Sequence, residues 1–333
     1  MRIAFYEIED WEREYLAGRL SGHELSFHEE PLSAETAAKA ADADAVSVFV
    51  YSRVDGDALA KLPKAKFVLT RSMGFDHIDL AACAKRGVVV SRVPSYGERT
   101  VAEHAFALIL ALSRKIFLAY ERTEKSVFDY RGLQGFDLYK KTLGIVGGGR
   151  IGMHVARIAR GFEMDVLVSD PFPKKELAET IGFRYAPLEE LLAKADVVTL
   201  HAPYMPETHH LMNDARFALM KRGAVIVNTS RGALIDTQAL LKALQDGILS
   251  GAGLDVLEEE TFIREESELM SKDFPKKSDL AAVVRDHMLI ARNDVIITPH
   301  IGFNSREAME RILETTVENV EGCAKGSPVN VVK

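Results

Sequence analysis

A glycine-rich turn between an apolar run and an amphipathic stretch is the feature that most restricts the fold of this chain. The turn lies in residues 143–152, Leu-Gly-Ile-Val-Gly-Gly-Gly-Arg-Ile-Gly. Gly147, Gly149 and Gly152 have the spacing G-x-G-x-x-G. Between a strand and a helix, the first glycine permits a tight turn and the third lets the helix pack closely on the strand. The segment therefore predicts a βαβ unit and a parallel sheet.

Short apolar runs recur along the whole chain and predict further strands. They are residues 2–8, 43–50, 67–70, 87–90, 142–146, 165–169, 195–200, 223–228, 251–254 and 295–298. Helical patterns separate many of these runs, for example residues 151–161 and 236–245. This alternation is typical of parallel sheets that are buried under helices on both faces. The chain is therefore predicted to be an α/β protein.

The length of the chain predicts two domains. It has 333 residues, and a single hydrophobic core stops growing at about 250 to 300 residues. Two long helical patterns begin at Glu98 and at Asn304, which is a good N-cap residue. We expect two Rossmann-like or flavodoxin-like parallel-sheet domains. One is discontinuous (residues 1–98 plus 302–333), and the other is inserted into it (residues 99–301).

Residues 258–293 interrupt the alternation of strands and helices. The segment begins with a charged run that includes Glu258, Glu259 and Glu260, and a helical pattern follows at residues 279–290. We interpret it as a surface excursion of the inserted domain and not as a third domain.

Composition excludes several classes of function. The formal net charge is −7, and non-specific affinity for nucleic acid comes mostly from Lys and Arg. Cys83 and Cys323 are the two cysteines and no C-x-x-C occurs, so neither a disulfide framework nor a zinc site is expected. The first residues do not resemble a secretory signal, and no apolar run reaches the roughly 18 residues that span a membrane. We expect a cytoplasmic protein that binds neither nucleic acid nor membrane and holds no metal.

The glycine-rich turn also indicates a dinucleotide site. Gly149 lets the backbone approach a pyrophosphate, which would lie at the N-terminus of the helix. Asp170 lies eighteen residues beyond Gly152, at the end of the next predicted strand. An acid there accepts hydrogen bonds from the adenosine ribose and repels a 2′-phosphate, which favours NAD over NADP. The plainer interpretation is a glycine-rich turn in which Asp170 caps the following helix.

Three further segments place a polar side chain just after a predicted strand, where ligands bind in open α/β sheets. Arg231 follows Val227-Asn-Thr-Ser, Glu260 follows Gly253-Leu-Asp255 by five residues, and His300 follows Ile297-Thr-Pro. Each residue also has an ordinary interpretation. Arg231 would belong to a surface ion pair, Glu260 to a solvated acidic run, and His300 would be a histidine that simply ends a strand.

Taken together in this order, the motifs resemble the D-isomer-specific 2-hydroxyacid dehydrogenase family. The resemblance extends to Thr-Arg-Ser-Met-Gly-Phe-Asp-His-Ile-Asp at residues 70–79 and to Val-Pro-Ser-Tyr-Gly-Glu-Arg-Thr-Val-Ala-Glu-His at residues 93–104. It implies that the chain transfers hydride between NADH and a small 2-oxo acid, giving a D-2-hydroxy acid. It also implies a homodimer, with NAD bound in the inserted domain.

The resemblance assigns roles to the three strand-end residues. Arg231 would hold the substrate carboxylate and polarise the 2-oxo group, because its guanidinium is permanently charged and forks onto two oxygens. His300 would exchange the proton of the 2-hydroxyl. Glu260 would bind the other ring nitrogen and favour the imidazolium that reduction needs.

The resemblance implies further contacts. The backbone N–H groups of residues 73–75 would bind the carboxylate, and Tyr51, Tyr96 and Phe303 would line the substrate pocket; ordinary aromatic packing is the alternative for these rings. The expected substrate-binding residues are Tyr51, Met73, Gly74, Tyr96, Arg231, His300 and Phe303. The expected NAD contacts besides Gly147, Gly149, Gly152 and Asp170 are Arg150, Ile151, Pro171, Ala202, Pro203, Thr208, Thr229, Ser230 and Asp255, the last through the nicotinamide amide.

The other histidines in these motifs are not expected to take part in acid–base chemistry, since the sequence indicates no partner for them. They are His77, His104, His201, His209 and His210. The His209-His210 pair is interpreted as part of a helix surface and not as a metal site.

The substrate is predicted from the branch of the family that the chain resembles. Pro299 and Glu260 argue against the formate dehydrogenase branch, which pairs its histidine with a glutamine. Phe303 and the excursion at residues 258–293 resemble the D-lactate dehydrogenase branch, which favours pyruvate and D-lactate. A hydroxypyruvate/glyoxylate reductase and an aromatic 2-oxo acid reductase remain as alternatives. An NAD(H)-sensing, corepressor-like binding protein is the alternative of another class.

Overall fold

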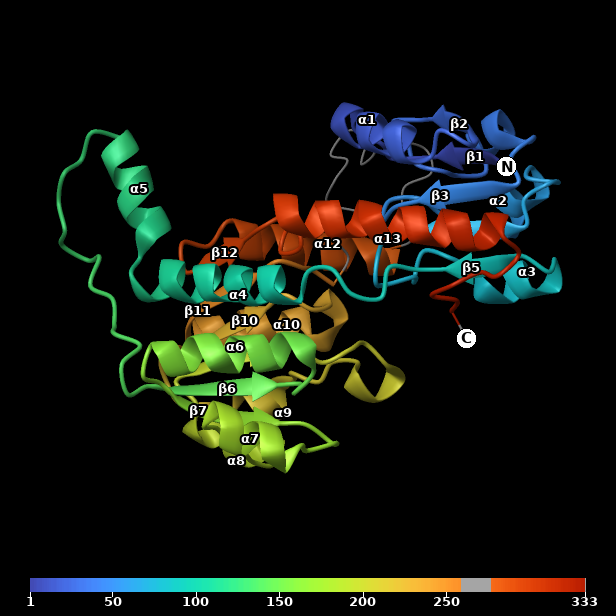
Figure 1. Ribbon diagram of the computed structural model, residues 1–333. Coiled ribbons are helices and arrows are strands. Elements are labelled where there is room, and N and C mark those ends of the chain that lie inside the picture. Colours follow the sequence, from blue (N-terminus) through green and yellow to red (C-terminus); the bar gives the residue numbers. More distant parts are fainter. Residues whose placement is uncertain (259–276, 333) are drawn as a thin grey trace. The chain divides into compact units, whose positions relative to one another are not determined.

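The chain divides into two compact units, Met1–Gly97 with Asn304–Lys333, and Glu98–Phe303. The computed structural model describes residues 1–258 and 277–332 (Figure 1). Glu260 therefore lies outside the described residues, as does much of the predicted excursion at residues 258–293. Within the described ranges, we find no helix with the length and apolar character that a membrane crossing needs.

The first unit is built on a five-stranded parallel sheet of order β2-β1-β3-β4-β5. Its strands are β1 (Arg2–Phe5), β2 (Glu24–Phe27), β3 (Ala45–Val48), β4 (Phe67–Thr70) and β5 (Val89–Ser91). Its helices are α1 (Asp10–Arg19), the 3₁₀ helix η1 (Ala37–Ala40), α2 (Gly56–Ala60), α3 (Leu80–Lys85) and α13 (Arg306–Ala324). This strand order is that of flavodoxin-like folds.

The C-terminal helix α13 completes the core of the first unit. Leu313, Val317 and Val320 of α13 pack with Ile3 and Phe5 of β1 in one buried cluster. The N-cap of α13 is Ser305 and not the predicted Asn304, because the Ser305 hydroxyl accepts the hydrogen bond from the Ala308 N–H at 3.2 Å. The chain thus returns to the first sheet after it has formed the second unit.

The second unit is built on a seven-stranded parallel sheet of order β12-β11-β10-β9-β6-β7-β8. Its strands are β6 (Thr142–Val146), β7 (Asp165–Ser169), β8 (Arg184–Tyr185), β9 (Val197–Leu200), β10 (Ala224–Asn228), β11 (Leu249–Leu254) and β12 (Val295–Ile297). The order of β6 to β11 is the Rossmann order, which reverses between β6 and β9. Ligands bind at the carboxyl ends of the strands beside this reversal.

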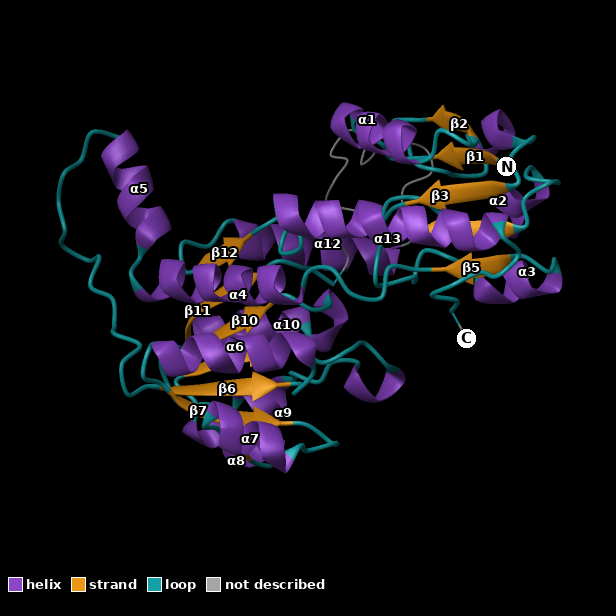
Figure 2. Ribbon diagram, viewed as in Figure 1, coloured by secondary structure: helices purple, strands orange, loops and turns teal. Residues whose placement is uncertain are grey.

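Helices cover both faces of the second sheet (Figure 2). The helices of the second unit are α4 (Glu98–Ser113), α5 (Ile116–Glu124), α6 (Arg150–Gly161), α7 (Lys175–Ile181), α8 (Leu188–Lys194), α9 (Asp214–Phe217), α10 (Thr237–Gln245) and α12 (Lys277–Ile290), with the 3₁₀ helices η2 (Pro206–Thr208) and η3 (Gly232–Leu234). Helices α4 and α6 share one buried cluster with the sheet, and α8, α9 and α10 share the other.

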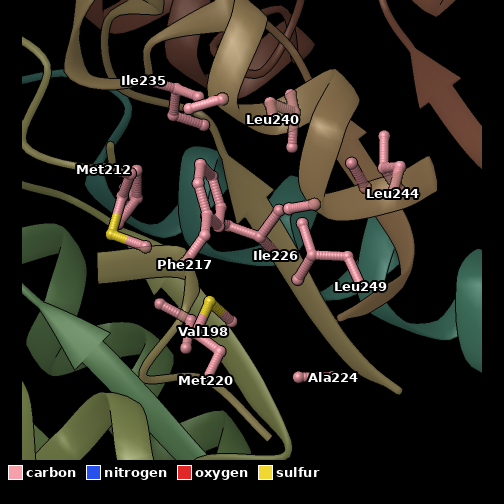
Figure 3. Close-up of a cluster of buried hydrophobic side chains, with 14 of the residues drawn as sticks. Val198, Met212, Phe217, Met220, Ala224, Ile226, Ile235, Leu240, Leu244 and Leu249 are labelled. Atoms are coloured by element: carbon pink, nitrogen blue, oxygen red, sulfur yellow. The ribbon is translucent and has the colours of Figure 1, made fainter. Parts of the chain in front are cut away.

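The second of these clusters has Phe217 of α9 near its middle, beside Ile226 of β10 and Val198 of β9 (Figure 3). Each residue of β9 and β10 is buried. Strands that are buried on both faces are apolar along their whole length, which explains why the sequence revealed them so clearly.

The predicted fold class is confirmed, and each of the ten predicted apolar runs overlaps an observed strand. The edge strands β2 and β8 were not predicted from the sequence. Both are half-exposed and lack a continuous apolar run. Helix α5 was not predicted either, and none of its residues is buried.

Candidate active site

The backbone of the glycine-rich turn accepts only glycine at two positions. Gly147, directly after β6, has φ +100°, and a Cβ there would lie 2.6 Å from the backbone of His201 and Ala202. A Cβ on Gly152 would lie 2.1 Å from the carbonyl oxygen of Gly147. Real Cβ atoms do not approach backbone this closely, so α6 can reach this position against β6 only without a side chain at Gly152.

The N-terminus of α6 has open space beside it. Gly149 is the N-cap, and a Cβ built on it meets no atom within 4 Å. The first N–H groups of a helix have no partner within the helix, and the helix dipole favours an anion there. Arg150 is exposed, and its Nη1 lies 3.3 Å from Glu98 Oε1. The predicted neighbour Ile151 packs against the buried cluster below α6.

Asp170 follows β7 and is fixed by backbone donors. Its Oδ2 accepts the Gly148 N–H at 2.6 Å, and its Oδ1 accepts the Phe172 N–H at 2.7 Å. Each carboxylate oxygen retains a lone pair that can accept from a ribose hydroxyl. The N-cap of α7 is Lys174, so the simpler interpretation of Asp170 as the cap of the next helix is wrong. Pro171, directly after it, is exposed.

Hydrogen bonds from side-chain hydroxyls stabilise the loops that follow β9 and β10. Ser230 Oγ donates to the carbonyl oxygen of Ala202 at 2.6 Å. Thr208 Oγ1 donates to the carbonyl oxygen of Pro203 at 2.8 Å. The hydroxyl of Thr229 is buried, and no hydrogen-bond partner for it is found among the described residues. A buried hydroxyl of this kind, with the open helix N-terminus and Asp170, fits a dinucleotide.

Arg231 lies after β10 in a turn that its neighbours fix. Its Nη1 donates to the carbonyl oxygen of Ser230 at 2.9 Å, and Asn228 Nδ2 donates to the carbonyl oxygen of Arg231 at 2.9 Å. A Cβ on Gly232 would lie 2.0 Å from the carbonyl group of Leu257. The glycine therefore lets the chain that leaves β11 pack directly against the turn of Arg231.

His300 adopts a left-handed backbone conformation after β12. Its φ is +52°, and its N–H donates to the carbonyl oxygen of Thr298 at 2.9 Å. A non-glycine residue rarely adopts this conformation, so its surroundings must impose it. The ring of Phe303 lies edge-on to the imidazole, with 6.5 Å between ring centres and an interplanar angle of 75°.

Asp255, at the end of β11, fixes the loop that carries His300. It is 2% exposed, and its Oδ1 accepts from Thr298 Oγ1 at 2.5 Å and from the Ile301 N–H at 2.9 Å. Its Oδ2 accepts the Gly302 N–H at 2.8 Å. The sequence indicated only a contact with the nicotinamide amide. In the structure, both carboxylate oxygens of Asp255 accept hydrogen bonds from donors within the protein.

His104 of α4 contacts the same carboxylate. Its Nε2 lies 3.3 Å from Asp255 Oδ1 and 3.0 Å from Thr298 Oγ1. Burial by itself would raise the pKa of Asp255, but hydrogen bonds from its donors stabilise the charged form and hold the pKa below its ordinary range. The sequence did not indicate this partner of His104, because the two residues lie about 150 positions apart. That His104 takes no part in acid–base chemistry stays a prediction.

His210 also has a partner that the sequence did not reveal. Its Nε2 lies 2.6 Å from Oε1 of Glu258, whose Oε2 accepts from Thr237 Oγ1 at 2.8 Å. His210 follows η2 with φ +48° and is not on a helix surface, so that interpretation was wrong. Among the described residues, no group of three or more His, Cys, Asp or Glu could hold a metal ion.

The residues expected to bind substrate in the first unit lie beyond the carboxyl ends of β3, β4 and β5. The N–H of Tyr51 donates to Glu7 Oε1 at 2.7 Å, and the Ser72 hydroxyl donates to the carbonyl oxygen of Gly74 at 2.6 Å. The carbonyl oxygen of Met73 accepts from Arg92 at 3.2 Å, and that of Tyr96 accepts from Arg311 at 2.6 Å. Glu7 was not among the predicted site residues, and only its place after a buried strand could have indicated it.

Known proteins resemble this chain over nearly its full length. Residues 106–302 match the family model described as D-isomer specific 2-hydroxyacid dehydrogenase, NAD binding domain. A D-lactate dehydrogenase of Escherichia coli (strain K12) is 38% identical over 333 residues, covering 98% of each chain. A glyoxylate reductase of Thermococcus litoralis is 37% identical over 302 residues, covering 88% of this chain and 85% of that protein. The structure of a D-lactate dehydrogenase from Aquifex aeolicus complexed with NAD and lactic acid matches with a TM-score of 0.84 at 37% identity, covering 98% and 96%.

The Rossmann sheet, the glycine-rich turn and the strand-end residues define the second unit as the NAD-binding domain of an oxidoreductase. The chain belongs to the D-isomer-specific 2-hydroxyacid dehydrogenase family. It is thus an NAD-dependent D-2-hydroxyacid dehydrogenase, as the sequence motifs predicted. The alternative of an NAD(H)-sensing, corepressor-like protein is not favoured, because the matched proteins are dehydrogenases and reductases.

Proposed function

We propose that this protein reduces pyruvate to D-lactate with NADH, and that Arg231, Glu260 and His300 are its catalytic residues. One observation carries the proposal. The neighbouring strands β10, β11 and β12 bring Arg231, Asp255 and His300 to the same edge of the NAD-binding sheet. The first unit would be the substrate domain and the second the cofactor domain.

The proposed residues have the chemistry that the reaction needs. NAD, when bound, supplies or accepts the hydride. Arg231 would bind the substrate carboxylate through its fork of donors and polarise the 2-oxo group. His300 would donate a proton to the 2-oxo oxygen in reduction and take it back in oxidation. Glu260 stays a proposal from the sequence, as the partner that keeps this imidazole protonated.

Phe303 supports a small apolar substrate side chain. Its ring lies edge-on to the His300 imidazole, so an apolar surface adjoins the proposed proton donor. The D-lactate dehydrogenases of E. coli and A. aeolicus are full-length relatives, which also supports pyruvate. The T. litoralis glyoxylate reductase is also a relative of this chain, so glyoxylate is the second candidate substrate.

The arm formed by α5 and residues 125–134 supports the proposed homodimer. No residue of α5 is buried, and Ile116, Phe117 and Tyr120 are at least half exposed. Phe128 is 98% exposed and Tyr130 is 86% exposed. Figure 1 shows the arm projecting from α4 away from the second sheet. Apolar surface of this kind normally marks an interface, and we propose that a second copy of the chain covers it in a cytoplasmic dimer.

The enzyme assay follows NADH absorbance with pyruvate, glyoxylate and phenylpyruvate. We expect kcat/KM to be highest for pyruvate and the product to be D-lactate. Arg231→Gln should lower kcat/KM at least about 100-fold, because a charge-assisted pair with the carboxylate is lost. Arg184→Gln, a change at an exposed arginine of the edge strand β8, is the control. No oxidation of NADH with any of these acids would refute the proposal.

The dimer is tested by light scattering during gel filtration. Wild-type protein should elute with twice the mass of the chain. The double variant Phe128→Ser with Tyr130→Ser should be monomeric, and an unchanged dimer would show that the arm is not the interface.

A further inference from the structure

The first unit contains charged residues near the carboxyl ends of β1 and β4 to which the function proposed above assigns no role. Arg71, directly after β4, is 1% exposed, and Glu12 of α1 is 3% exposed. Glu7, two residues after the end of β1, is partly buried beside them. We call these three residues the buried charge cluster. Charged groups are costly to bury, so each must have partners that offset the loss of water.

The guanidinium of Arg71 joins the end of β1 to the end of β3. Its Nη2 donates to the carbonyl oxygens of Tyr6 at 2.9 Å and of Glu7 at 2.6 Å. Its central carbon lies 5.5 Å from the ring centre of Phe49. Its Nε lies 4.0 Å from Glu12 Oε1, so the positive charge has a buried counter-ion.

The carboxylate of Glu7 holds the chain that leaves β3. Its two oxygens accept the N–H groups of Phe49 at 3.0 Å, Tyr51 at 2.7 Å and Ser52 at 2.9 Å, together with the Ser52 hydroxyl. Glu7 reaches these donors from a left-handed conformation with φ +55°. A carboxylate that binds three backbone donors of one loop fixes the course of that loop.

The same cluster fixes the start of the loop after β4. The N–H of Arg71 donates to the carbonyl oxygen of Val48 at 2.8 Å, and its side chain is anchored at the end of β1. The next residues are Ser72, Met73 and Gly74, and the Ser72 hydroxyl closes a turn onto the Gly74 carbonyl at 2.6 Å. Arg71 therefore fixes the start of the loop that carries the N–H groups of residues 73–75.

We propose that Glu7 and Arg71 are positioning residues for substrate binding, because one charge cluster fixes both loops that carry the expected substrate contacts of the first unit, Tyr51 and residues 73–75. The proposal rests on the proposed 2-oxo acid reductase function. Substrate affinity would then depend on a carboxylate and a guanidinium that lie beneath the loops and have no expected contact with the substrate.

The test separates this role from a contribution to stability alone. Glu7→Gln keeps the shape of the side chain but leaves one acceptor oxygen in place of two. We expect the KM for pyruvate to rise about ten-fold or more, which corresponds to the loss of one hydrogen bond to a charged group. The inhibition constant of oxamate, a pyruvate isostere, should rise in parallel. The Kd of NADH, whose predicted contacts lie in the second unit, should stay within about two-fold.

The matched control is Glu24→Gln in β2, where an exposed glutamate pairs with Arg2. Its KM should equal that of the wild type. If Glu7→Gln does not yield folded protein, Ser52→Ala removes one of the donors to Glu7 and should raise the same two constants to a smaller degree.

The outcomes are distinguishable. An unchanged KM and oxamate constant in a folded Glu7 variant, even with a lower melting temperature, would overturn the positioning role. An inactive wild-type protein would instead refute the proposed function.

Discussion

The pH dependence of stability should depend strongly on His201, which follows β9 and abuts the glycine-rich turn. Its Nε2 contacts Thr199 Oγ1 at 2.9 Å, and its Nδ1 is buried without a hydrogen-bond partner among the described residues. A protonated ring would place an N–H and a charge in this buried position. Burial accordingly lowers the pKa of His201 from 6.5 to about 3.

The sign of the effect follows from proton binding in the two states. Between pH 6.5 and pH 3 the unfolded chain holds a proton on His201 that the folded chain does not hold. Stability therefore falls as the pH falls through this window. The loss at pH 5 is about 2 kcal/mol, and the full loss below pH 3 approaches about 5 kcal/mol, since each unit of pKa shift is worth about 1.4 kcal/mol. For a unit of about 200 residues, 2 kcal/mol lowers the melting temperature by about 5 °C.

Differential scanning calorimetry of wild type and His201→Gln at pH 7.5 and pH 5 measures this loss. The transition of the second unit is the one that added NADH raises. Between the two pH values, the wild-type midpoint should fall about 5 °C further than that of the variant. His209→Gln, at an exposed position directly after η2 in the same loop region, should behave as the wild type. Equal pH dependence in wild type and His201→Gln would refute the assigned burial of this ring.

Three further predictions concern the cofactor domain. Asp170→Ala should raise the ratio of kcat/KM for NADPH to that for NADH about ten-fold or more, since the acid that repels a 2′-phosphate is removed; an unchanged ratio would mean that another group reads the ribose. Gly152→Ala places a Cβ 2.1 Å from the Gly147 carbonyl oxygen and should weaken NADH binding at least about ten-fold in a fluorescence titration, whereas Gly161→Ala in the same helix meets no atom within 4 Å and should bind normally. Asp255→Asn should lower kcat about ten-fold or more with less than about a three-fold change in the Kd of NADH, because it loosens the loop of the proposed proton donor; a loss confined to NADH affinity would favour the nicotinamide contact instead.

The conformation of the glycine-rich turn was determined by the sequence alone. Gly147 and Gly152 are required by backbone geometry over a few residues, and this requirement is the same wherever a strand turns into such a helix. The buried strands were equally clear, because strands covered on both faces are apolar throughout. The edge strand β2 gave no such signal, since it is half-exposed.

The partners of the site residues were decided only by the tertiary structure. The contact of His104 with Asp255 and that of Glu7 with the loop of Tyr51 join segments that are far apart in the sequence. Which strand ends become neighbours depends on strand order and register, and local patterns do not encode either. The sequence thus determined the backbone of the glycine-rich turn, whereas packing decided which charged groups hold His300 and the loop of Tyr51 in place.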